Sequence, residues 1–187
     1  MNTIKNISII IPAYNEENGI NDVISEIESI MNESNIKKEI IIVDDGSTDN
    51  TISKVNETNA KLIQHQQNRG YGAALKTGIK SSMYDVIAII DADGTYPPKY
   101  LIELVQNINN YDMIVGSRTG ENVNIPLVRR PAKWCLNKLA NFLTNYSIPD
   151  LNSGLRLFKK TTLMKFLHVL PDGFSFTTTI TIAMITN

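Results

Sequence analysis

The chain has 187 residues, of which 42% are hydrophobic and 20% charged, so one domain with a core is expected and disorder is disfavoured. No apolar run reaches the roughly 18 residues that a membrane span needs, no signal-peptide pattern is present, and the single cysteine, Cys135, excludes an internal disulfide and indicates a reducing compartment. Residues 1–116 hold 9 Lys or Arg and 16 Asp or Glu, whereas residues 117–187 hold 9 and 3, which leaves a net charge of −1.

Four apolar runs, the first interrupted only by Ser8, predict β-strands that are buried on both faces. They are Ile7–Ile11, Ile40–Val43, Val86–Ile90 and Met113–Val115. Because continuous Ile and Val runs without alternation are typical of sheets covered by helices on both sides, we expect a parallel sheet. Lys61–His65 is expected to form a further, more exposed strand.

Helical periodicity fills the segments between these strands. Apolar residues recur at three- and four-residue steps from Ile20 to Met31. A second helix is predicted after Asp49 and Asn50, either of which is a candidate N-cap, and another after Pro97-Pro98. The alternation of strands and helices predicts an α/β fold with right-handed crossovers.

The pattern changes after Gly116. A loop is expected over residues 117–130, and the elements predicted beyond it are a helix over Pro131–Asn145, a strand at Leu155–Phe158 and a short helix at Thr161–Leu167. The segment Phe174–Asn187 is rich in Thr and Ile, which favours a strand by propensity alone. No repeat or linker divides the chain, so residues 1–187 are expected to form a single domain.

Carboxylates follow three of the predicted strands. Glu16-Glu17 come soon after the first strand, Asp44-Asp45 after the second, and Asp91 with Asp93 after Val86–Ile90. Since ligands of α/β folds bind at the carboxyl ends of the strands, these side chains are candidates for a hard divalent cation with bound phosphates. Any one cluster is equally typical of a capped loop. The uneven charge indicates either solvated faces, or an acidic metal-binding half and a basic half that meets phosphates or an anionic membrane.

Asp91-Ala92-Asp93-Gly94 is the sharpest motif. An Asp-x-Asp pair on a turn can aim one carboxylate at a metal and the other at a sugar or at the metal's other ligands. Asp and Gly are also common turn residues, so the motif gains weight mainly from its place directly after Val86–Ile90.

The glycine-rich segment Asn68–Gly72 precedes a predicted helix and is either a phosphate-binding loop or a packing turn. It fails the dinucleotide fingerprint, because Leu75 stands where the third small residue is needed, and this argues against a nicotinamide enzyme. We expect His65, His168 and Trp134 to serve in packing or at the surface.

Together these motifs resemble the family 2 glycosyltransferases with the GT-A fold, a Rossmann-like, open and mostly parallel sheet flanked by helices on both faces. The segments that carry the resemblance are Ile10–Glu16, Val43–Asp49 and Asp91–Pro98, whose order and spacing match as a set. Asp150–Arg156 resembles the Ser-Gly-x-Arg segment of the branch that includes dolichol-phosphate mannose synthase. The resemblance covers about residues 5–180.

The resemblance implies a nucleotide pocket lined by residues from the three motifs. These are Pro12, Ala13, Tyr14, Glu16, Asp44, Asp45, Asp91, Ala92 and Asp93. Asp44 is expected to hydrogen-bond the base, and Asp45 to support it or the loop. Asp91 and Asp93 are catalytic candidates and metal ligands, with Asp93 holding Mg²⁺ or Mn²⁺ against the diphosphate.

Members of this branch transfer a sugar from a nucleoside diphosphate to a polyprenyl phosphate. A hydroxyl acceptor would need a general base, whereas a phosphate acceptor is already ionised. Many members that act on hydroxyls carry an acid near the position of Phe174–Ile180, where this sequence has none; Asp172 and Asp150 are the nearby candidates, and Asp150 is kept as a catalytic candidate. The candidates to hold phosphate groups are Arg129, Arg130, Lys133 and Arg156, of which Arg156 is also a catalytic candidate.

The sequence therefore predicts metal-dependent, inverting sugar transfer from a UDP- or GDP-sugar to a lipid phosphate such as dolichyl or undecaprenyl phosphate. The enzyme is expected at the cytoplasmic face of the membrane, with no nucleic-acid partner. Alternatives are transfer to a glycan or other hydroxyl, a nucleotide-sugar-binding domain without turnover, and, ranked lower, a nucleotidyltransferase. Family members usually continue beyond this point, so the domain is expected to be truncated at its C-terminus, and the family favours a partly helical Phe174–Asn187.

Overall fold

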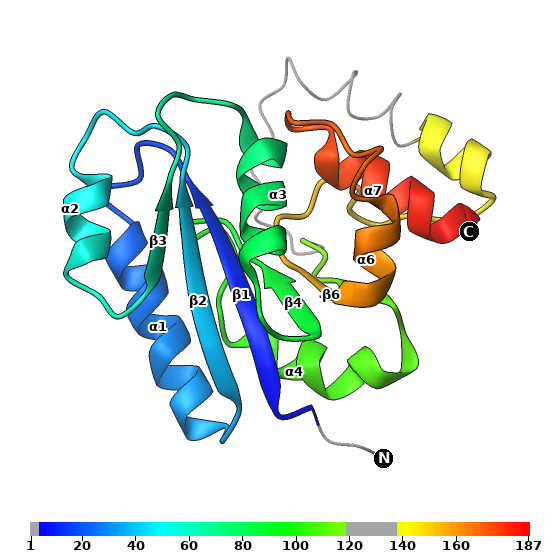
Figure 1. The fold of residues 1–187 in the computed structure, drawn as a ribbon. Coiled ribbons are helices and arrows are strands. Elements are labelled where there is room, and N and C mark those ends of the chain that lie inside the picture. The colour runs from blue at the N-terminus through cyan, green and yellow to red at the C-terminus, as the bar shows by residue number, and fades with distance from the viewer. Residues whose placement is uncertain (1–3, 119–137) are drawn as a thin grey trace.

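The structure, a computed structural model, describes residues 4–118 and 138–187 and shows one twisted sheet with helices on both faces (Figure 1). Its six strands lie in the order β3-β2-β1-β4-β6-β5. The strands are β1 (Asn6–Ala13), β2 (Lys37–Asp44), β3 (Lys61–Gln64), β4 (Val86–Ile89), β5 (Met113–Val115) and β6 (Arg156–Lys159). The helices are α1 (Ile20–Glu33), α2 (Thr51–Asn56), α3 (Tyr71–Ser81), α4 (Tyr100–Asn107), α6 (Lys160–Phe166) and α7 (Phe176–Thr186), with a 3₁₀ turn at Ile108–Asn110.

The sheet is parallel except at β6. β1 pairs in parallel with β2 and β4, and β2 pairs in parallel with β3, so the carboxyl ends of these four strands share one edge. β6 runs antiparallel to both β4 and β5 and lies between them. This arrangement confirms the predicted α/β fold with a mostly parallel sheet.

Side chains alternate between the two faces of the central strand β1. Ile7, Ile9 and Ile11 pack with α1 and α4 in one buried cluster. Ile10 points to the other face and packs with α3, α6 and α7 in a second cluster. Both clusters are shielded from solvent, which explains why the strands appear in the sequence as runs of apolar residues.

Each predicted strand and helix that falls in the described ranges is confirmed, with shifts of a few residues at the ends. The strand expected at Leu155–Phe158 begins at Arg156 and ends at Lys159. The helix expected over Pro131–Asn145 is described only from residue 138, where it is helical to residue 144. The loop expected over residues 117–130 and the packing role of Trp134 fall largely or wholly on residues 119–137, outside the described part.

The end of the chain is helical, as the family resemblance implied and against the strand propensity of its residues. α7 buries Phe176 and Ile180 in the cluster shared with α3 and α6, and buries Thr177 and Thr181 as well. This packing overrides the weak local preference of Thr and Ile for a strand. None of the helices in the described ranges combines the length and hydropathy that a membrane span requires.

Gly78 fixes how closely α3 approaches the sheet. A Cβ atom at this position would lie 2.4 Å from Cγ2 of the buried Ile10. We expect Gly78→Ala to lower the free energy of unfolding by about 1–2 kcal/mol, because overpacking outweighs the better helix propensity of Ala. Urea unfolding measures this, and Gly173→Ala, whose Cβ would meet nothing within 4 Å, is the control. A variant as stable as the parent protein would contradict this packing.

Candidate functional site

A cavity of about 280 Å³ opens at the carboxyl ends of β1 and β4. The chain reaches it from five places: the end of β1, the residue after β2, the turn after β4, the start of α3 and the turn before α7. Eight of the nine residues predicted to bind nucleotide line it: Pro12, Ala13, Tyr14, Glu16, Asp45, Asp91, Ala92 and Asp93. The fold thus brings together three motifs that are far apart in the sequence, because parallel strands end at one edge of the sheet.

The loops after β1 and β2 hold each other in place beside this cavity. Asn15 adopts a left-handed backbone with φ of 57°, and its N–H donates to Ser47 Oγ at 2.9 Å. Its side-chain Oδ1 in turn accepts from Thr48 N at 2.8 Å. Glu16 N donates to Thr51 Oγ1 at 2.8 Å, at the start of α2. The position of Tyr14 and Glu16 is therefore fixed by the second loop.

Asp44 and Asp45 have different surroundings. Asp45 Oδ1 accepts from Arg69 N and lies 2.6 Å from His65 Nδ1, while its Oδ2 accepts from Gly70 N. This is the loop-supporting role expected of Asp45, and it makes His65 a buried partner. Asp44 is fully buried, and its Oδ2 accepts from Gly46 N and Ser47 N. Its Oδ1 is buried with no hydrogen-bond donor from the described residues, and Asp44 is the one predicted nucleotide residue that does not line the cavity.

Asp91 is held between a tyrosine and a glycine. Tyr71 OH donates to its Oδ1 at 2.8 Å, and the ring of Tyr71 stacks on Phe174 with centroids 5.6 Å apart. On its other side Gly154 lies so close that a Cβ there would be 1.8 Å from Asp91 Oδ2. Burial raises the pKa of the Asp91 carboxyl, the Tyr71 hydrogen bond opposes this rise, and the charge of Asp93 adds to it. The carboxylate therefore has a fixed position.

Asp93 is exposed, and its Oδ1 accepts from Thr95 N at 2.9 Å. Glu16 lies near both aspartates: burial first, then the charges of Asp93 and Asp91, raise the pKa of the Glu16 carboxyl above its ordinary value. Carboxylates that lie this close together concentrate negative charge at the rim of the cavity. The rim of the cavity therefore has the character of a cation site.

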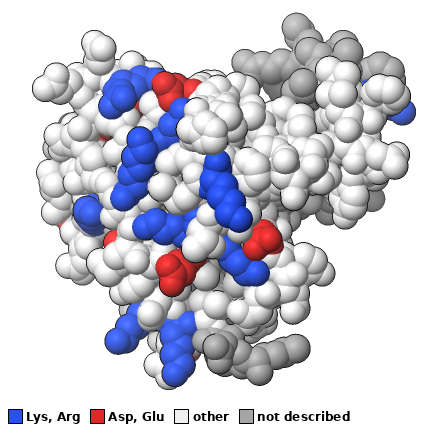
Figure 2. Space-filling view, turned by 45° about the vertical axis from the view of Figure 1, so that its right-hand side comes forward, with Lys and Arg blue, Asp and Glu red and all other residues white. Residues whose placement is uncertain are grey.

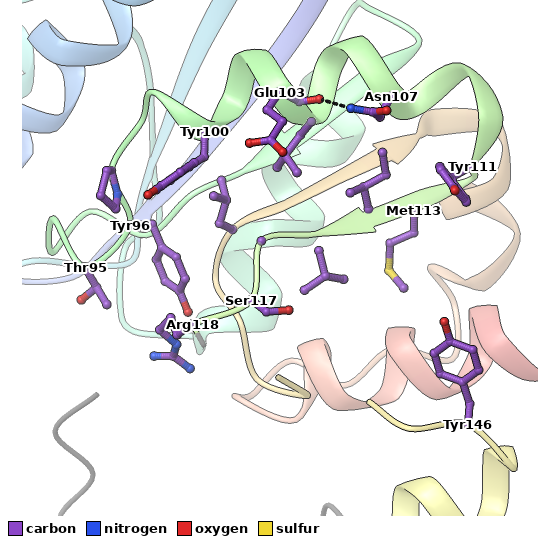
Figure 3. A pocket seen from close by; sticks show the side chains of 16 residues that line it. Thr95, Tyr96, Tyr100, Glu103, Asn107, Tyr111, Met113, Ser117, Arg118 and Tyr146 are labelled. Atoms are coloured by element: carbon purple, nitrogen blue, oxygen red, sulfur yellow. Dashed lines mark hydrogen bonds between the residues drawn. The ribbon is translucent and has the colours of Figure 1, made fainter. Parts of the chain in front are cut away.

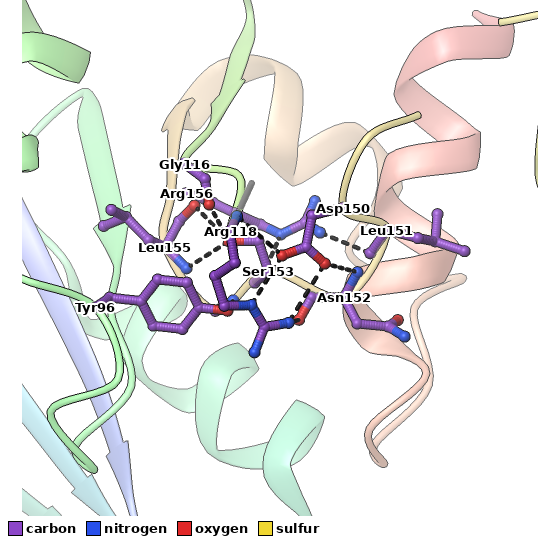
Figure 4. Close-up of polar contacts among 10 residues, drawn as sticks. Tyr96, Gly116, Arg118, Asp150, Leu151, Asn152, Ser153, Leu155 and Arg156 are labelled. Atoms are coloured by element: carbon purple, nitrogen blue, oxygen red, sulfur yellow. Dashed lines mark hydrogen bonds and ion pairs between the residues drawn. The ribbon is translucent and has the colours of Figure 1, made fainter. Parts of the chain in front are cut away.

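The turn that leads into β6 lies next to Asp91, because Gly154 of this turn is in close contact with the Asp91 carboxylate. Figure 4 shows the polar contacts of this turn. Asp150 makes an ion pair with Arg118, whose Nε lies 2.9 Å from Oδ2, and Arg118 also lies 5.2 Å from the ring centroid of Tyr96. Gly154 N donates to Tyr96 OH at 2.7 Å. The turn is thus tied to the segments that follow β4 and β5.

The structure contradicts the prediction that Arg156 binds a phosphate group of the substrate. Its side chain is fully buried, and its guanidinium donates to Ser153 O and Leu151 O at 2.8 Å each and to Thr181 Oγ1 at 2.6 Å. Burial lowers its pKa to about 10. A guanidinium enclosed in this way has no path to a substrate phosphate, so Arg156 holds the turn and α7 together instead. Arg129, Arg130 and Lys133, the other phosphate candidates, lie outside the described residues.

A larger hollow of about 1500 Å³ lies along α4 and β5 (Figure 3). Thr95, Tyr96 and Arg118 lie at one end of it, and Tyr111 and Tyr146 lie at the other. None of the predicted catalytic or nucleotide residues lines it. The size of this hollow alone does not indicate a reaction, and the predicted site residues line the smaller cavity instead.

Comparison with known proteins decides the family. The sequence profile described as Glycosyl transferase family 2 matches residues 8–167. The chain belongs to glycosyl transferase family 2. It is 36% identical over 184 residues to UDP-N-acetylglucosamine–dolichyl-phosphate N-acetylglucosaminyltransferase of Methanococcus voltae, covering 85% of this chain and 71% of that protein. It is 33% identical over 182 residues to dolichol-phosphate mannosyltransferase of Pyrococcus furiosus, covering 90% of this chain and 50% of that protein.

The fold of this glycosyltransferase domain also matches solved structures. One is glucosyl-3-phosphoglycerate synthase from Mycobacterium tuberculosis in complex with Mn²⁺, UDP-glucose and phosphoglyceric acid, with a TM-score of 0.75 at 21% identity. The match covers 96% of this chain and 64% of that one, so the chain spans somewhat less than two thirds of the solved protein. A likeness at this identity shows the shared fold.

The family 2 motif residues fit a divalent cation that is shared with a substrate. Among the residues that the structure describes, no group of three or more His, Cys, Asp or Glu is arranged to hold a metal alone. Mg²⁺ usually keeps several waters and takes one or two carboxylates together with substrate phosphates. Asp91 and Asp93 both line the cavity and offer the one or two carboxylates that such a site takes.

Several predictions for other residues of this family 2 domain have clear outcomes. Gly70 and Gly72 form a closely packed turn, because a Cβ at either would lie 2.5 Å or less from a backbone oxygen of Asp172 or Pro171, while Asn68 and Gly70 also line the cavity. Asp172 is exposed and lies 2.7 Å from Lys76 Nζ, which lowers its pKa. His65 is buried in packing and His168 is exposed, as expected.

Sequence reasoning missed two residues of the site, Tyr71 and Arg118. Tyr71 belongs to the glycine-rich segment Asn68–Gly72, whose pattern indicates a role for the backbone and gives no sign of the hydroxyl that reaches Asp91. Arg118 comes three residues after β5, at the same edge of the sheet as the acidic clusters. The positive charge of Arg118 beside these acidic clusters is the sequence signal that could have identified it.

Proposed function

We propose that this domain transfers a sugar from a nucleoside-diphosphate sugar to a polyprenyl phosphate, with inversion at the anomeric carbon and with Mg²⁺ or Mn²⁺. The observation that carries the proposal is the cavity at the ends of β1 and β4, where Asp91, Asp93 and Glu16 gather beside the loop of Pro12–Tyr14. Membership of family 2 supports the transfer of a sugar.

The donor half of the proposal gives each motif a task. Pro12, Ala13, Tyr14 and Glu16 line the nucleotide pocket, and Asp45 keeps the Arg69–Gly70 backbone in place behind it. Asp44 is proposed to bind the base, which is supported by its buried Oδ1 atom that still lacks a donor among the described residues. A small movement of the loop has to expose that atom, because Asp44 does not line the cavity.

Asp91 and Asp93 are proposed to hold the divalent cation, and the cation would neutralise charge on the departing nucleoside diphosphate. Tyr71 and Gly154 then have a positioning task, since they fix the carboxylate of Asp91 from two sides. The solved fold relative with Mn²⁺ and UDP-glucose supports this choice of metal and donor class.

The acceptor half rests on the state of the nearby acids. Asp150 is paired with Arg118, and Asp172 is paired with Lys76, which lowers its pKa. Neither is a good general base, so an acceptor that is already ionised suits this site. The names of two relatives, which act on dolichyl phosphate or dolichol phosphate, support a lipid phosphate. Such an acceptor also supports the cytoplasmic membrane face as the place of the reaction.

The test is the thermal stability of the purified protein with UDP or GDP, each with and without Mn²⁺. A nucleotide at about 100 times its Kd should add about 2.7 kcal/mol of stability. We expect this gain with one nucleotide, only when Mn²⁺ is present, and we expect Asp93→Ala to lose it. Asp112→Ala, a change of another exposed aspartate whose side chain only pairs with Lys159, should keep it.

Protein that is folded but gains no stability from either nucleotide would rule out the proposed donor site. With a donor identified, transfer is assayed on a polyprenyl phosphate and on the free polyprenol. Product from the phosphate alone supports the proposal. Product from the alcohol alone would instead favour transfer to a hydroxyl, and binding without any product would favour a nucleotide-sugar-binding domain.

A further inference from the structure

Phe174 is a strongly exposed aromatic residue at the opening of the cavity that carries the proposed donor site. It lines this cavity with Asp91 and Asp93, yet it is 84% exposed. Its ring stacks on that of Tyr71, with an angle of 17° between the rings and 5.6 Å between their centroids. A phenyl ring offers neither a charge nor a hydrogen-bonding group to the carboxylates or to a cation. Because most of its surface is still exposed, the ring can take a further apolar partner inside the cavity.

The turn that carries Phe174 is attached to α3 through its backbone. Asp172 O accepts from Ala73 N at 3.0 Å, and a Cβ at Gly70 would lie 2.5 Å from the same oxygen. Asp172 Oδ1 also pairs with Lys76 Nζ at 2.7 Å. Figure 1 shows this turn, which precedes α7, beside the start of α3. The ring is therefore exposed by a backbone with several fixed contacts.

The charges around the turn favour the same attachment. Lys76 first, and then Arg69 and Lys80, lower the pKa of the Asp172 carboxyl. Figure 2 shows Lys and Arg gathered over the face on which α3 and α6 lie. An aspartate among these cations draws the turn towards α3, although each exposed pair contributes little by itself. Phe174 is thus presented to the cavity from one position.

The place of Phe174 along the edge of the sheet indicates which part of a donor it faces. In the proposed function, Asp44 at the end of β2 binds the base, whereas Asp91 and Asp93 after β4 bind the cation and the diphosphate. β1 lies between β2 and β4. A donor that runs from β2 to β4 carries its sugar, which is bonded to the distal phosphate, at or beyond the end of β4. Phe174 lies there, because its stacking partner Tyr71 donates to Asp91 Oδ1.

We propose that Phe174 binds the sugar of the donor, with its ring packed against the C–H face of a hexose. The face of an aromatic ring carries partial negative charge and attracts the weakly positive hydrogens of C–H groups. The inference rests on the proposed function, since it needs a nucleotide sugar in the cavity. It adds a contact that is made to the sugar and is absent once the sugar has left the nucleotide.

The test compares a nucleoside diphosphate with its sugar conjugates on the same protein. Isothermal titration with Mn²⁺ measures the Kd of UDP, UDP-glucose and UDP-N-acetylglucosamine, or of GDP and GDP-mannose if GDP is the nucleotide that raises thermal stability. We expect Phe174→Ala to raise the Kd of the bound sugar conjugate about tenfold and to leave that of the diphosphate within about twofold. Phe174→Tyr, which keeps the face of the ring, should bind both ligands like the parent protein.

Two further variants separate a contact with the sugar from a change elsewhere. Phe142→Ala removes a phenylalanine of matched exposure, 83% against 84%, that does not line the cavity, and it should change neither Kd. Tyr71→Phe keeps the ring that stacks on Phe174 but removes the hydroxyl from Asp91. It should raise the Kd of the diphosphate and of the conjugate by the same factor, because both ligands bind the same cation.

Three results with Phe174→Ala would overturn the inference. They are an equal rise in the Kd of the diphosphate and of the conjugate, an unchanged Kd for every conjugate, and a defect confined to the KM for polyprenyl phosphate, which would assign the ring to the acceptor. A parent protein that binds no nucleotide would refute the proposed function and this inference together. Normal binding of the diphosphate, without any effect of Phe174→Ala on the conjugates, would refute the inference alone.

Discussion

Gly154→Ala is expected to weaken Mn²⁺-dependent nucleotide binding and sugar transfer about 100-fold, because a displacement of about 1 Å in a catalytic group has that scale of effect. The added Cβ would lie 1.8 Å from Oδ2 and 2.3 Å from Cγ of Asp91. Asp91 cannot stay in place, since Tyr71 OH holds its other oxygen. Either the carboxylate leaves the tyrosine or the whole turn moves away from the cavity.

Isothermal titration with the nucleotide identified by thermal stability, at a temperature where the variant is folded, measures this effect. Gly173→Ala is the control, because its Cβ would meet nothing within 4 Å. If Gly154→Ala bound nucleotide as tightly as the parent protein, Asp91 would have no part in holding the donor. The proposed function would then lose one of its two metal ligands.

Arg156→Met is expected to lower the free energy of unfolding by about 3 kcal/mol, because each buried group left without its hydrogen bond costs about 1–3 kcal/mol. The guanidinium donates to two buried carbonyls, those of Leu151 and Ser153, and it also donates to Thr181 Oγ1 of α7. A lysine in its place presents one ammonium and cannot reach three acceptors that lie in different directions. Arg156→Lys should therefore recover only part of the loss.

Urea unfolding of the two variants measures the change in stability, and Lys159→Met is the control. Lys159 is adjacent to Phe158 in β6 but is partly exposed, and it pairs only with the exposed Asp112 and an exposed carbonyl. A surface pair of this kind contributes less than about 1 kcal/mol. If Arg156→Met and Lys159→Met had the same free energy of unfolding, the buried hydrogen bonds of Arg156 would not stabilise the fold. A direct role of Arg156 in catalysis would then be favoured.

The strands and the acidic edge could be predicted from the sequence because both depend on local signals. Unbroken apolar runs such as Ile40–Val43 favour buried strands in a chain of this composition, and neighbouring parallel strands end at one edge of the sheet. Carboxylates that follow such runs therefore meet, as Glu16 and Asp93 do. The same reasoning could not reveal that Asp44 is fully buried and does not line the cavity, because the burial of a single side chain depends on the loop packed above it.

The second half of the site was harder to predict because its signals are not local. Arg156 follows the Ser-Gly pattern and carries a positive charge, which favours a phosphate-binding role. Its hydrogen-bond partners in the structure are instead carbonyls brought near by a turn and a helix. α7 is helical although its Thr and Ile residues prefer strands, because Phe176 and Ile180 are needed in the core. In both cases the deciding contacts come from distant parts of the chain.

The place of β6 in the sheet has a consequence for how the protein folds. β5 pairs with β6 in the described sheet, and the two are separated along the chain by residues 116–155. β5 therefore has to wait for a later segment before it gains a hydrogen-bonded neighbour in this sheet, whereas β1 to β4 pair among themselves and are all present once the chain has reached Ile89. Because these four strands do not need β5 or β6 in order to pair with one another, the nucleotide half should assemble first, and the turn against Asp91 should close last. During synthesis, the newly made chain should acquire a donor pocket before it acquires the segment that completes it.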